Sequence, residues 1–223
     1  RYTLSLARAV NPAGIMDPPA HSGEAPARHV TERALEYASA LGVPPLRDVF
    51  FISEGGSSTE EAPVLFFPGT TRPSKMWPVE KWLALGEAVW KETGAEPLFA
   101  GSPADRPIAE KLKRAAFPYR DLIGQTSLAE LTGLIRQARV IVSVDNGAMH
   151  LSDFLHRPTI ALFGSTDPSQ VGPIHDRSVV LGPRGECILC RKHRCKRQKL
   201  FCMDQISPDD VLKEFKKAWK TPY

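Results

Sequence analysis

The sequence contains no long hydrophobic run, although 42% of its 223 residues are hydrophobic. Nowhere do about 18 apolar residues follow one another without a charge, so no membrane-spanning helix is expected. The N-terminal stretch RYTLSLARAV also lacks the extended apolar core and the small-residue cleavage site of a secretory signal peptide. These two absences predict a soluble, cytoplasmic protein with enough apolar residues for one good core.

Cysteine is absent except in one short segment near the C-terminus. That segment contains all of the cysteines of the chain, Cys187, Cys190, Cys195 and Cys202. Because no export signal is seen, free thiols or a metal site are expected rather than disulfides. The spacing C-x2-C-x4-C-x6-C departs from common zinc ribbons. Zinc binding and cysteines packed as small apolar residues both remain open, and we assign no metal ligand.

Acidic residues are almost missing from the same segment. Against the single acid Glu186 stand the basic residues Arg184, Arg191, Lys192, Arg194, Lys196, Arg197 and Lys199. Such a cluster favours an anionic partner, whether phosphate, nucleic acid or an acidic membrane, and it is also compatible with a solvated loop. Aromatic side chains for base stacking are sparse there, with only Phe201, so no nucleic-acid partner is expected.

The N-terminal part of the chain differs in character from the rest. Residues 1–28 are rich in proline and glycine and predict a loop. A helical pattern follows over 31–41 and ends at Gly42. The stretch SEGGSSTEEAP (53–63) then has the composition of a flexible linker, so the sequence predicts a boundary there.

Beyond this linker, short apolar runs alternate with helical patterns. Strands are predicted at 64–67, 97–100, 140–144 and 159–163, with a short one at 122–123. Helices are predicted from Pro78 to Gly94, near 105–116, from the capping box Ser127-x-x-Glu130 onward, and from Ser207. This alternation implies right-handed βαβ units and therefore an α/β fold with a Rossmann-like, doubly wound parallel sheet. Ligands of such sheets bind beyond the carboxyl ends of the strands.

The first polar loop at such an end is PGTTRPSKMWP (68–78). Gly69 lets a ligand approach the backbone closely. Hydroxyls and cations that suit phosphate oxygens follow it, at Thr70, Thr71, Arg72 and Lys75. The G-x-x-x-x-G-K-[ST] spacing is absent, which excludes a P-loop.

The second polar loop lies within VIVSVDNGAMHL (140–151), where a strand gives way to a helix. A helix start leaves unpaired backbone N–H groups and a positive end in the crevice, which suits a diphosphate. Gly147 allows close approach, and His150 would project from the first turn toward the same anion. Asp145 is expected to cap the helix or to accept a hydrogen bond from a hydroxyl, because a carboxylate repels phosphate.

The third polar loop is FGSTDP (163–168), another glycine-containing turn after a strong strand. Its composition fits an ordinary turn as well as a direct ligand role. Because the three loops follow strands of one parallel sheet, they would converge on one crevice.

These motifs resemble the lipopolysaccharide heptosyltransferases, glycosyltransferase family 9 enzymes of the GT-B fold. From Pro63 onward the chain is similar to their C-terminal nucleotide-sugar domain. The resemblance rests on GTTRPSKMWPVEKW (69–82), SVDNGAMHLSDFLHRPTIALFGSTDPSQVGP (143–173) and CMDQISPDDV (202–211). It implies an inverting transfer of a heptose from an ADP-activated donor to a lipid-linked saccharide of the lipopolysaccharide core, without a cofactor. The absence of an Asp-x-Asp pair agrees with charge stabilisation by lysine and a helix end rather than by a metal.

The resemblance also implies roles for individual residues. Lys75 becomes the catalytic cation at the diphosphate. Substrate contacts are expected from Thr70, Thr71, Thr126, Asp145, Asn146, Gly147, Ala148 and His150. Asn146 departs from the family pattern, which usually has a hydroxyl there, although its backbone N–H can still serve. The acid that the family often places near the ribose has no clear match, since Asp105 is only nearby.

The resemblance divides the chain into three parts. Residues 1–52 correspond to a remnant of the N-terminal acceptor domain, 53–62 to the linker, and 63–223 to the nucleotide-sugar domain. The last part includes the Cys-rich basic segment 184–203 and a C-terminal helix at 208–220. Most of the acceptor domain, with its catalytic base, is absent, so we expect a fragment, a truncated paralogue or half of a split enzyme. A nucleotide-sugar binding or regulatory module is the alternative, and peripheral contact with the inner face of an anionic membrane is a further expectation.

Overall fold

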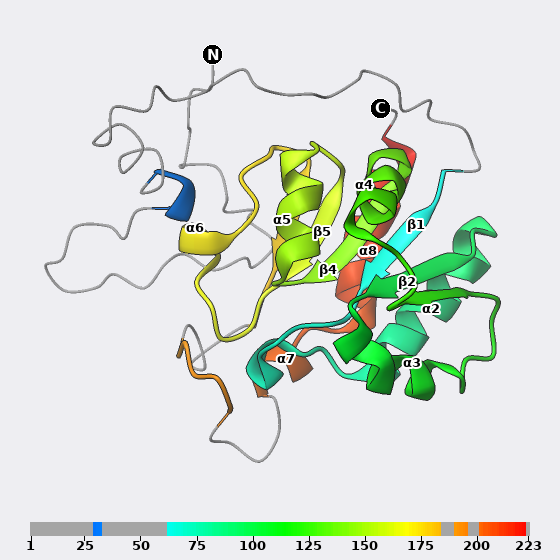
Figure 1. The fold of residues 1–223 in the computed structure, drawn as a ribbon, viewed down its shortest axis with the longest axis horizontal. Helices are drawn as coiled ribbons and strands as arrows, with labels where there is room; N and C mark the ends of the chain where they lie inside the picture. The colour runs from blue at the N-terminus through cyan, green and yellow to red at the C-terminus, as the bar shows by residue number, and fades with distance from the viewer. Residues whose placement is uncertain (1–28, 33–61, 184–189, 196–200, 222–223) are drawn as a thin grey trace, which may run out of the picture.

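The computed structural model describes residues 29–32, 62–183, 190–195 and 201–221, which include one α/β domain (Figure 1). Its six strands form a single parallel sheet in the order β3-β2-β1-β4-β5-β6. The strands are β1 (Val64–Phe67), β2 (Pro97–Gly101), β3 (Arg120–Ile123), β4 (Val140–Val144), β5 (Thr159–Leu162) and β6 (Ser178–Leu181). The predicted doubly wound sheet is thereby confirmed.

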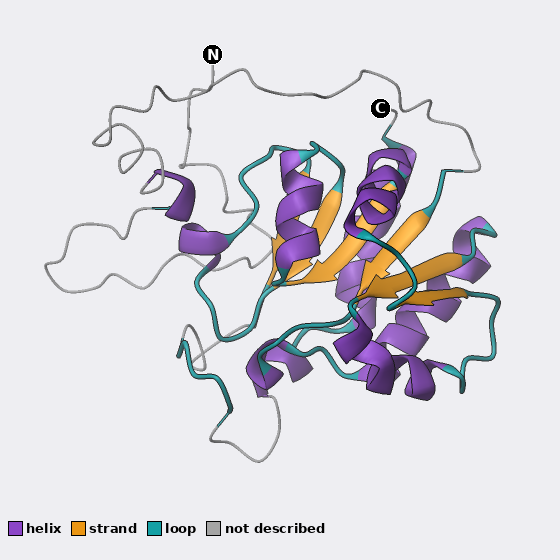
Figure 2. Cartoon of the chain, in the orientation of Figure 1, coloured by secondary structure: helices purple, strands orange, loops and turns teal. Residues whose placement is uncertain are grey.

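Helices cover both faces of this sheet (Figure 2). They are α2 (Val79–Thr93), α3 (Arg106–Leu112), α4 (Leu128–Gln137), α5 (Gly147–Phe154), α6 (Pro168–Val171), α7 (Phe201–Asp204) and α8 (Pro208–Lys220), with the 3-10 turns η2 (Pro73–Lys75) and η3 (Pro103–Asp105). Helices α2, α3 and α8 pack on one face, and α4 and α5 pack on the other. All residues of β1, β4 and β5 are therefore buried, which explains why these strands are largely apolar, with Ser143 and Thr159 as their polar residues.

The strand order places a topological switch between β1 and β4. The chain winds outward from β1 through β2 to β3, and from β4 through β5 to β6 on the other side. Crossover connections therefore diverge at this point, and ligands of such sheets bind in a crevice outside the carboxyl ends of the two central strands. The loops after β1 and β4 are the ones that border this crevice.

An aromatic cluster packs against the loop after β1. Trp82 of α2 lies 5.5 Å from the ring of Phe66 and 5.0 Å from that of Trp77. The indole N–H of Trp77 donates to the carbonyl of Ile206 at 3.0 Å. The two tryptophans are at most 1% exposed, so the loop from β1 to α2 rests on a rigid apolar base.

The local signals of the sequence predict the boundaries of several elements. Strands β1 and β4 have the predicted limits, and the Ser127–Glu130 capping box opens α4. Helix α2 starts at Val79, because Pro78 is its N-cap rather than its first residue. The helix predicted near 105–116 is shorter, since α3 begins at Arg106, directly after η3, and ends at Leu112.

Other predictions were incomplete or fall where the structure gives no description. Strand β6 and the single-turn helices α6 and α7 were not predicted. The predicted loop at 1–28, nearly all of the helix at 31–41 and the linker at 53–61 lie outside the described residues. In the parts of the chain that are described, each helix is too short or too polar to cross a bilayer.

Candidate functional site

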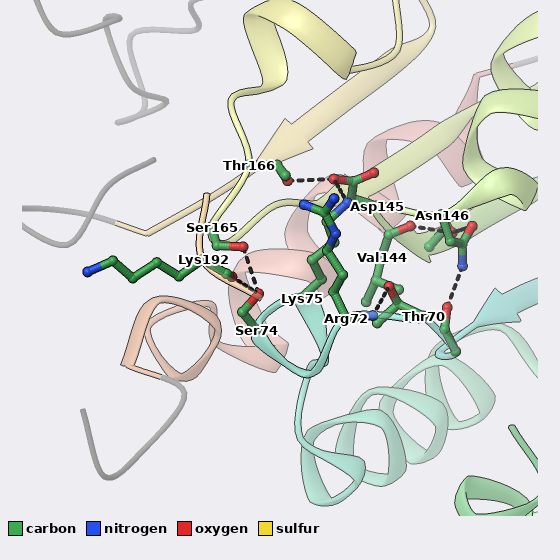
Figure 3. A network of polar contacts seen from close by, with 12 residues as sticks. Thr70, Arg72, Ser74, Lys75, Val144, Asp145, Asn146, Ser165, Thr166 and Lys192 are labelled. Atoms are coloured by element: carbon green, nitrogen blue, oxygen red, sulfur yellow. Dashed lines mark hydrogen bonds and ion pairs between the residues drawn. The ribbon is translucent and has the colours of Figure 1, made fainter. Parts of the chain in front are cut away.

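The crevice at the switch point is organised around Asp145, the first residue after β4. Its carboxylate is buried, with the residue only 4% exposed. One oxygen, Oδ2, accepts from the Lys75 ammonium at 2.6 Å and from the Thr166 hydroxyl at 2.5 Å. Figure 3 shows these side chains meeting from the loops after β1, β4 and β5. The expected convergence of the three loops is thus present in the fold.

Lys75 reaches Asp145 from the turn η2. Its side chain is 13% exposed, so the ammonium lies at the edge of the crevice rather than in open solvent. Arg72, three residues before Lys75, is exposed and adds a second cation to the same loop. Two cations in one loop favour the approach of an anion.

Asn146 connects the loops on both sides of the switch point. Its side-chain oxygen accepts from the backbone N–H of Met149 at 3.0 Å, which makes Asn146 the N-cap of α5. Its amide nitrogen donates to the carbonyl of Gly69 at 2.8 Å. The cap expected of Asp145 is therefore supplied by Asn146, and Asp145 has the other expected role, that of a hydroxyl acceptor. The Asn146 side chain is committed to the scaffold, so any ligand contact falls to its backbone.

The start of α5 faces the crevice with free backbone donors. Met149 is capped by Asn146, and the N–H of His150 bonds to the Asn146 carbonyl. The first-turn N–H groups of Gly147 and Ala148 have no partner within the helix, as at any helix start. A Cβ atom added at Gly147 would meet nothing within 4 Å, so the approach to these groups is open. The positive end of α5 is available to an anion.

His150 lies on α5, close enough to interact electrostatically with Lys75 and Asp145. His150 is exposed, and desolvation by the protein atoms around its ring is the main cause that lowers its pKa below the ordinary value of 6.5. Nearby His29 and Lys75 act in the same direction. The carboxylates of Asp145 and Asp153 oppose this shift without reversing it. The environment of the free protein therefore favours the neutral form of the imidazole over the protonated form.

This lowered pKa predicts that anion binding at the site takes up a proton. A diphosphate beside His150 raises the pKa of the imidazole, so affinity for ADP increases as the pH falls toward the pKa of the free protein. Calorimetric titrations of ADP at pH 6.5, the ordinary pKa of the ring, in two buffers of different ionisation enthalpy measure this uptake. His150→Gln should remove the proton uptake by the imidazole and leave only the protonation change of the ADP phosphate itself. Equal proton uptake by both proteins would contradict the placement of His150 beside the anion.

The threonines predicted to bind substrate occupy two different places. Thr70 and Thr71 lie in the loop after β1, where Thr70 Oγ1 accepts from the N–H of Arg72 at 3.4 Å. Thr126 follows β3, which β2 separates from β1. Two strand spacings amount to about 10 Å, so Thr126 could only reach a part of the ligand far from Lys75.

Three hydroxyls of this site lie in the predicted loops but were not among the predicted substrate contacts. Ser74 and Ser165, which are 1% and 2% exposed, lie with their Oγ atoms 2.9 Å apart, and Thr166 bonds to Asp145. The available signal was FGSTDP after a strongly predicted strand, which was also compatible with an ordinary turn. Part of the loop is such a turn, since Asp167 caps α6.

The Cys-rich basic segment is described in part and lies against this site. Within 190–195, the N–H of Arg191 donates to the Ser165 carbonyl at 2.7 Å. Cys190 is exposed, whereas Cys202 is buried at 4% exposure, as expected for a small apolar residue. Cys187 lies outside the described residues, and among those described no group of three metal-binding side chains occurs.

The fold and its switch point define the class of the protein. The sheet is that of a doubly wound α/β domain, the architecture of one half of a GT-B glycosyltransferase. Residues 21–201 match glycosyltransferase family 9 (heptosyltransferase). The chain belongs to this family.

Individual relatives agree with this assignment. Lipooligosaccharide heptosyltransferase 2 of Haemophilus ducreyi is 33% identical over 168 residues, which are 71% of this chain and 48% of that protein. Lipopolysaccharide heptosyltransferase 1 of Pseudomonas aeruginosa is 29% identical over 87% of this chain and 60% of its own length. The structure of the Escherichia coli ADP-heptose lipopolysaccharide heptosyltransferase II matches with a TM-score of 0.60 and 25% identity, over 87% of this chain and 53% of that chain.

A second solved structure shows the same fold. Escherichia coli heptosyltransferase WaaC with ADP matches with a TM-score of 0.62 and 23% identity, over 87% of this chain and 58% of that chain. The chain spans about half of the length of the curated relatives and solved structures that it matches.

Proposed function

We propose that this domain binds the ADP-activated heptose donor of a heptosyltransferase, with the diphosphate between Lys75 and the start of α5. The observation that carries the proposal is the meeting of Lys75 and Asp145 at 2.6 Å beside the first turn of α5. This arrangement lies at the switch point, where ligands of doubly wound sheets bind. The names of the relatives suggest that the donor sugar is a heptose. The cations and the helix start suggest where its diphosphate binds.

The chemistry of the site is stabilisation of a leaving diphosphate. Negative charge grows on the phosphate as the bond to the anomeric carbon breaks, and the Lys75 ammonium attracts that charge. The N–H groups of Gly147 and Ala148 add two donors that need no reorganisation. The hydroxyls of Thr70 and Thr71 border the same space from the loop after β1. Lys75 is therefore the catalytic cation of the proposal.

The other half of the reaction requires a base on the acceptor. In an inverting transfer, the acceptor hydroxyl attacks the anomeric carbon from the face opposite the diphosphate while a base removes its proton. We assign this base to the N-terminal acceptor domain of the longer relatives. The acceptor of the proposal is a lipid-linked saccharide of the lipopolysaccharide core, as the names of the relatives suggest.

A binding module without transfer activity is the second candidate. It rests on the meeting of Lys75 and Asp145 beside the start of α5, which by itself supports the binding of a diphosphate. Such a module would keep the crevice and bind ADP, but it would require a partner chain to act on a saccharide.

A transfer assay separates these candidates. ADP-heptose and a heptose-deficient lipopolysaccharide are incubated with the chain alone and with an added N-terminal half of a family 9 relative. The transferase proposal expects ADP release and sugar incorporation in the complemented reaction. ADP binding without transfer in any complemented reaction would favour the module, and failure to bind ADP would overturn the donor site itself.

The basic segment is proposed to contact an anionic membrane surface, where a lipid-linked acceptor resides. Its described cations Arg191, Lys192 and Arg194 are exposed. We expect binding to phosphatidylglycerol vesicles that weakens as salt rises, and little binding to neutral vesicles. Charge reversal by Lys192→Glu with Arg194→Glu should abolish it in a sedimentation assay. Vesicle binding that is independent of both salt concentration and lipid charge would contradict this electrostatic contact with the membrane.

A further inference from the structure

Two adjacent hydroxyls of the loop after β5 contact the surroundings of Lys75. Ser165 contacts Ser74, the residue directly before Lys75, with the two Oγ atoms 2.9 Å apart. Thr166 donates to Asp145, the counter-ion of Lys75. One loop therefore contacts the backbone neighbour of the lysine and the partner of its ammonium (Figure 3).

The direction of each hydrogen bond follows from the chemistry of its partners. The Ser74 hydroxyl donates its single proton to the carbonyl of Lys192 at 2.6 Å, so it must accept from Ser165. A carboxylate can only accept, so Thr166 must donate to Asp145. Each hydroxyl thus has one defined orientation, and each is largely shielded from water, with Thr166 only 9% exposed.

The backbone of this loop is itself fixed by packing. A Cβ atom added at Gly164 would come within 2.6 Å of the sulfur of Met203 on α7, so the loop lies directly against that helix. The N–H of Phe163 donates to Leu181 at 2.8 Å, and the Ser165 carbonyl accepts from Arg191 at 2.7 Å. The hydroxyls of Ser165 and Thr166 are therefore presented from a rigid support.

We propose that Thr166 is a positioning residue for Lys75, acting through Asp145, and that it sets the affinity of the site for a diphosphate. The inference rests on the proposed function, because it assigns Lys75 to that anion. A lysine side chain has many rotamers, and holding its ammonium in place before the ligand arrives removes an entropic cost of binding. Thr166 fixes the carboxylate that holds this ammonium.

The test compares Thr166→Val, which keeps the shape but loses the hydroxyl, with Thr166→Ser, which keeps the hydroxyl. Isothermal titration measures the affinity for ADP and for adenosine, which lacks the phosphates. We expect Thr166→Val to weaken ADP binding about tenfold and Thr166→Ser to stay within about twofold of the natural chain. Adenosine affinity should not change in either variant.

A double-mutant cycle shows whether the effect passes through the lysine. In a Lys75→Met background, Thr166→Val should change ADP affinity by less than about twofold, because no ammonium remains to be positioned. A residue that only stabilised the fold would weaken ADP and adenosine alike, and its effect would persist without Lys75. Either of those results would overturn the inference, and Thr166→Ala takes the place of Thr166→Val if that variant does not fold.

The outcomes also separate this inference from the proposed function. If Lys75→Met weakens ADP binding while Thr166→Val does not, the donor site stands and the role of Thr166 is wrong. If the natural chain does not bind ADP, or binds it equally well without Lys75, both proposals are wrong.

Discussion

Lys75→Met is expected to reduce turnover about 10²–10³-fold in a transfer reaction completed with the acceptor half, as removal of one preorganised donor to a developing anion commonly does. The reason is the position of the Lys75 side chain, which is 13% exposed and holds its ammonium 2.6 Å from Asp145, two residues before α5. The Asp145 carboxylate already holds this ammonium in place before a ligand binds. The measurement is the rate of ADP release at saturating donor.

Two controls separate charge stabilisation from an effect on folding. Lys91→Met removes a lysine that is 63% exposed and paired with Glu87, so it should leave turnover unchanged. Lys75→Met alone leaves Asp145 buried without its ion pair, which costs stability. The double variant with Asp145→Asn should recover the melting temperature but not the rate. A Lys75→Met rate equal to that of Lys91→Met would contradict the role of this lysine.

Trp82→Ala is expected to lower the free energy of unfolding by about 3–5 kcal/mol, the usual cost of removing a large aromatic side chain from a core. Trp82 is fully buried and contacts Phe66 of β1, Phe99 of β2 and Trp77 of the site loop. Its loss therefore leaves a cavity under the loop that carries Lys75. Urea denaturation followed by circular dichroism measures the change.

Replacing each tryptophan by phenylalanine tests the same cluster more finely. The Trp82 indole N–H is buried and has no acceptor among the described residues, whereas that of Trp77 donates to Ile206. Trp77→Phe should therefore be more destabilising than Trp82→Phe by about 1 kcal/mol, the net value of one hydrogen bond. The reverse order in urea denaturation would show that the two side chains are packed differently.

The central part of the fold was predictable because its signals are local. Strand β1 is a continuous apolar run and β4 is interrupted only by Ser143, while the serine caps at Ser127 and Ser207 open α4 and α8. Strand β6 is only half-buried and lies at the sheet edge, where hydrophobic patterning is weak. Helices α6 and α7 have a single turn each, too short to show a helical period.

The part of the site that follows from the order of strands and loops was predictable from the sequence. The order of strands and loops places Lys75 near Asp145 and His150, and the resemblance adds their roles. Sequence could not show that Ser74 and Ser165 share a buried hydrogen bond, because these residues are 91 positions apart. Likewise, the hydrogen bond from the Asn146 side chain to the Gly69 carbonyl depends on the pairing of β1 with β4, which local patterns do not encode.

The most direct test of the whole account is a crystal structure of this chain with ADP bound. We expect the β-phosphate within hydrogen-bond distance of Lys75 Nζ and of the N–H groups of Gly147 and Ala148, with His150 facing the same anion. ADP bound elsewhere on the sheet, with Lys75 still joined to Asp145 and no phosphate at the start of α5, would contradict the donor site.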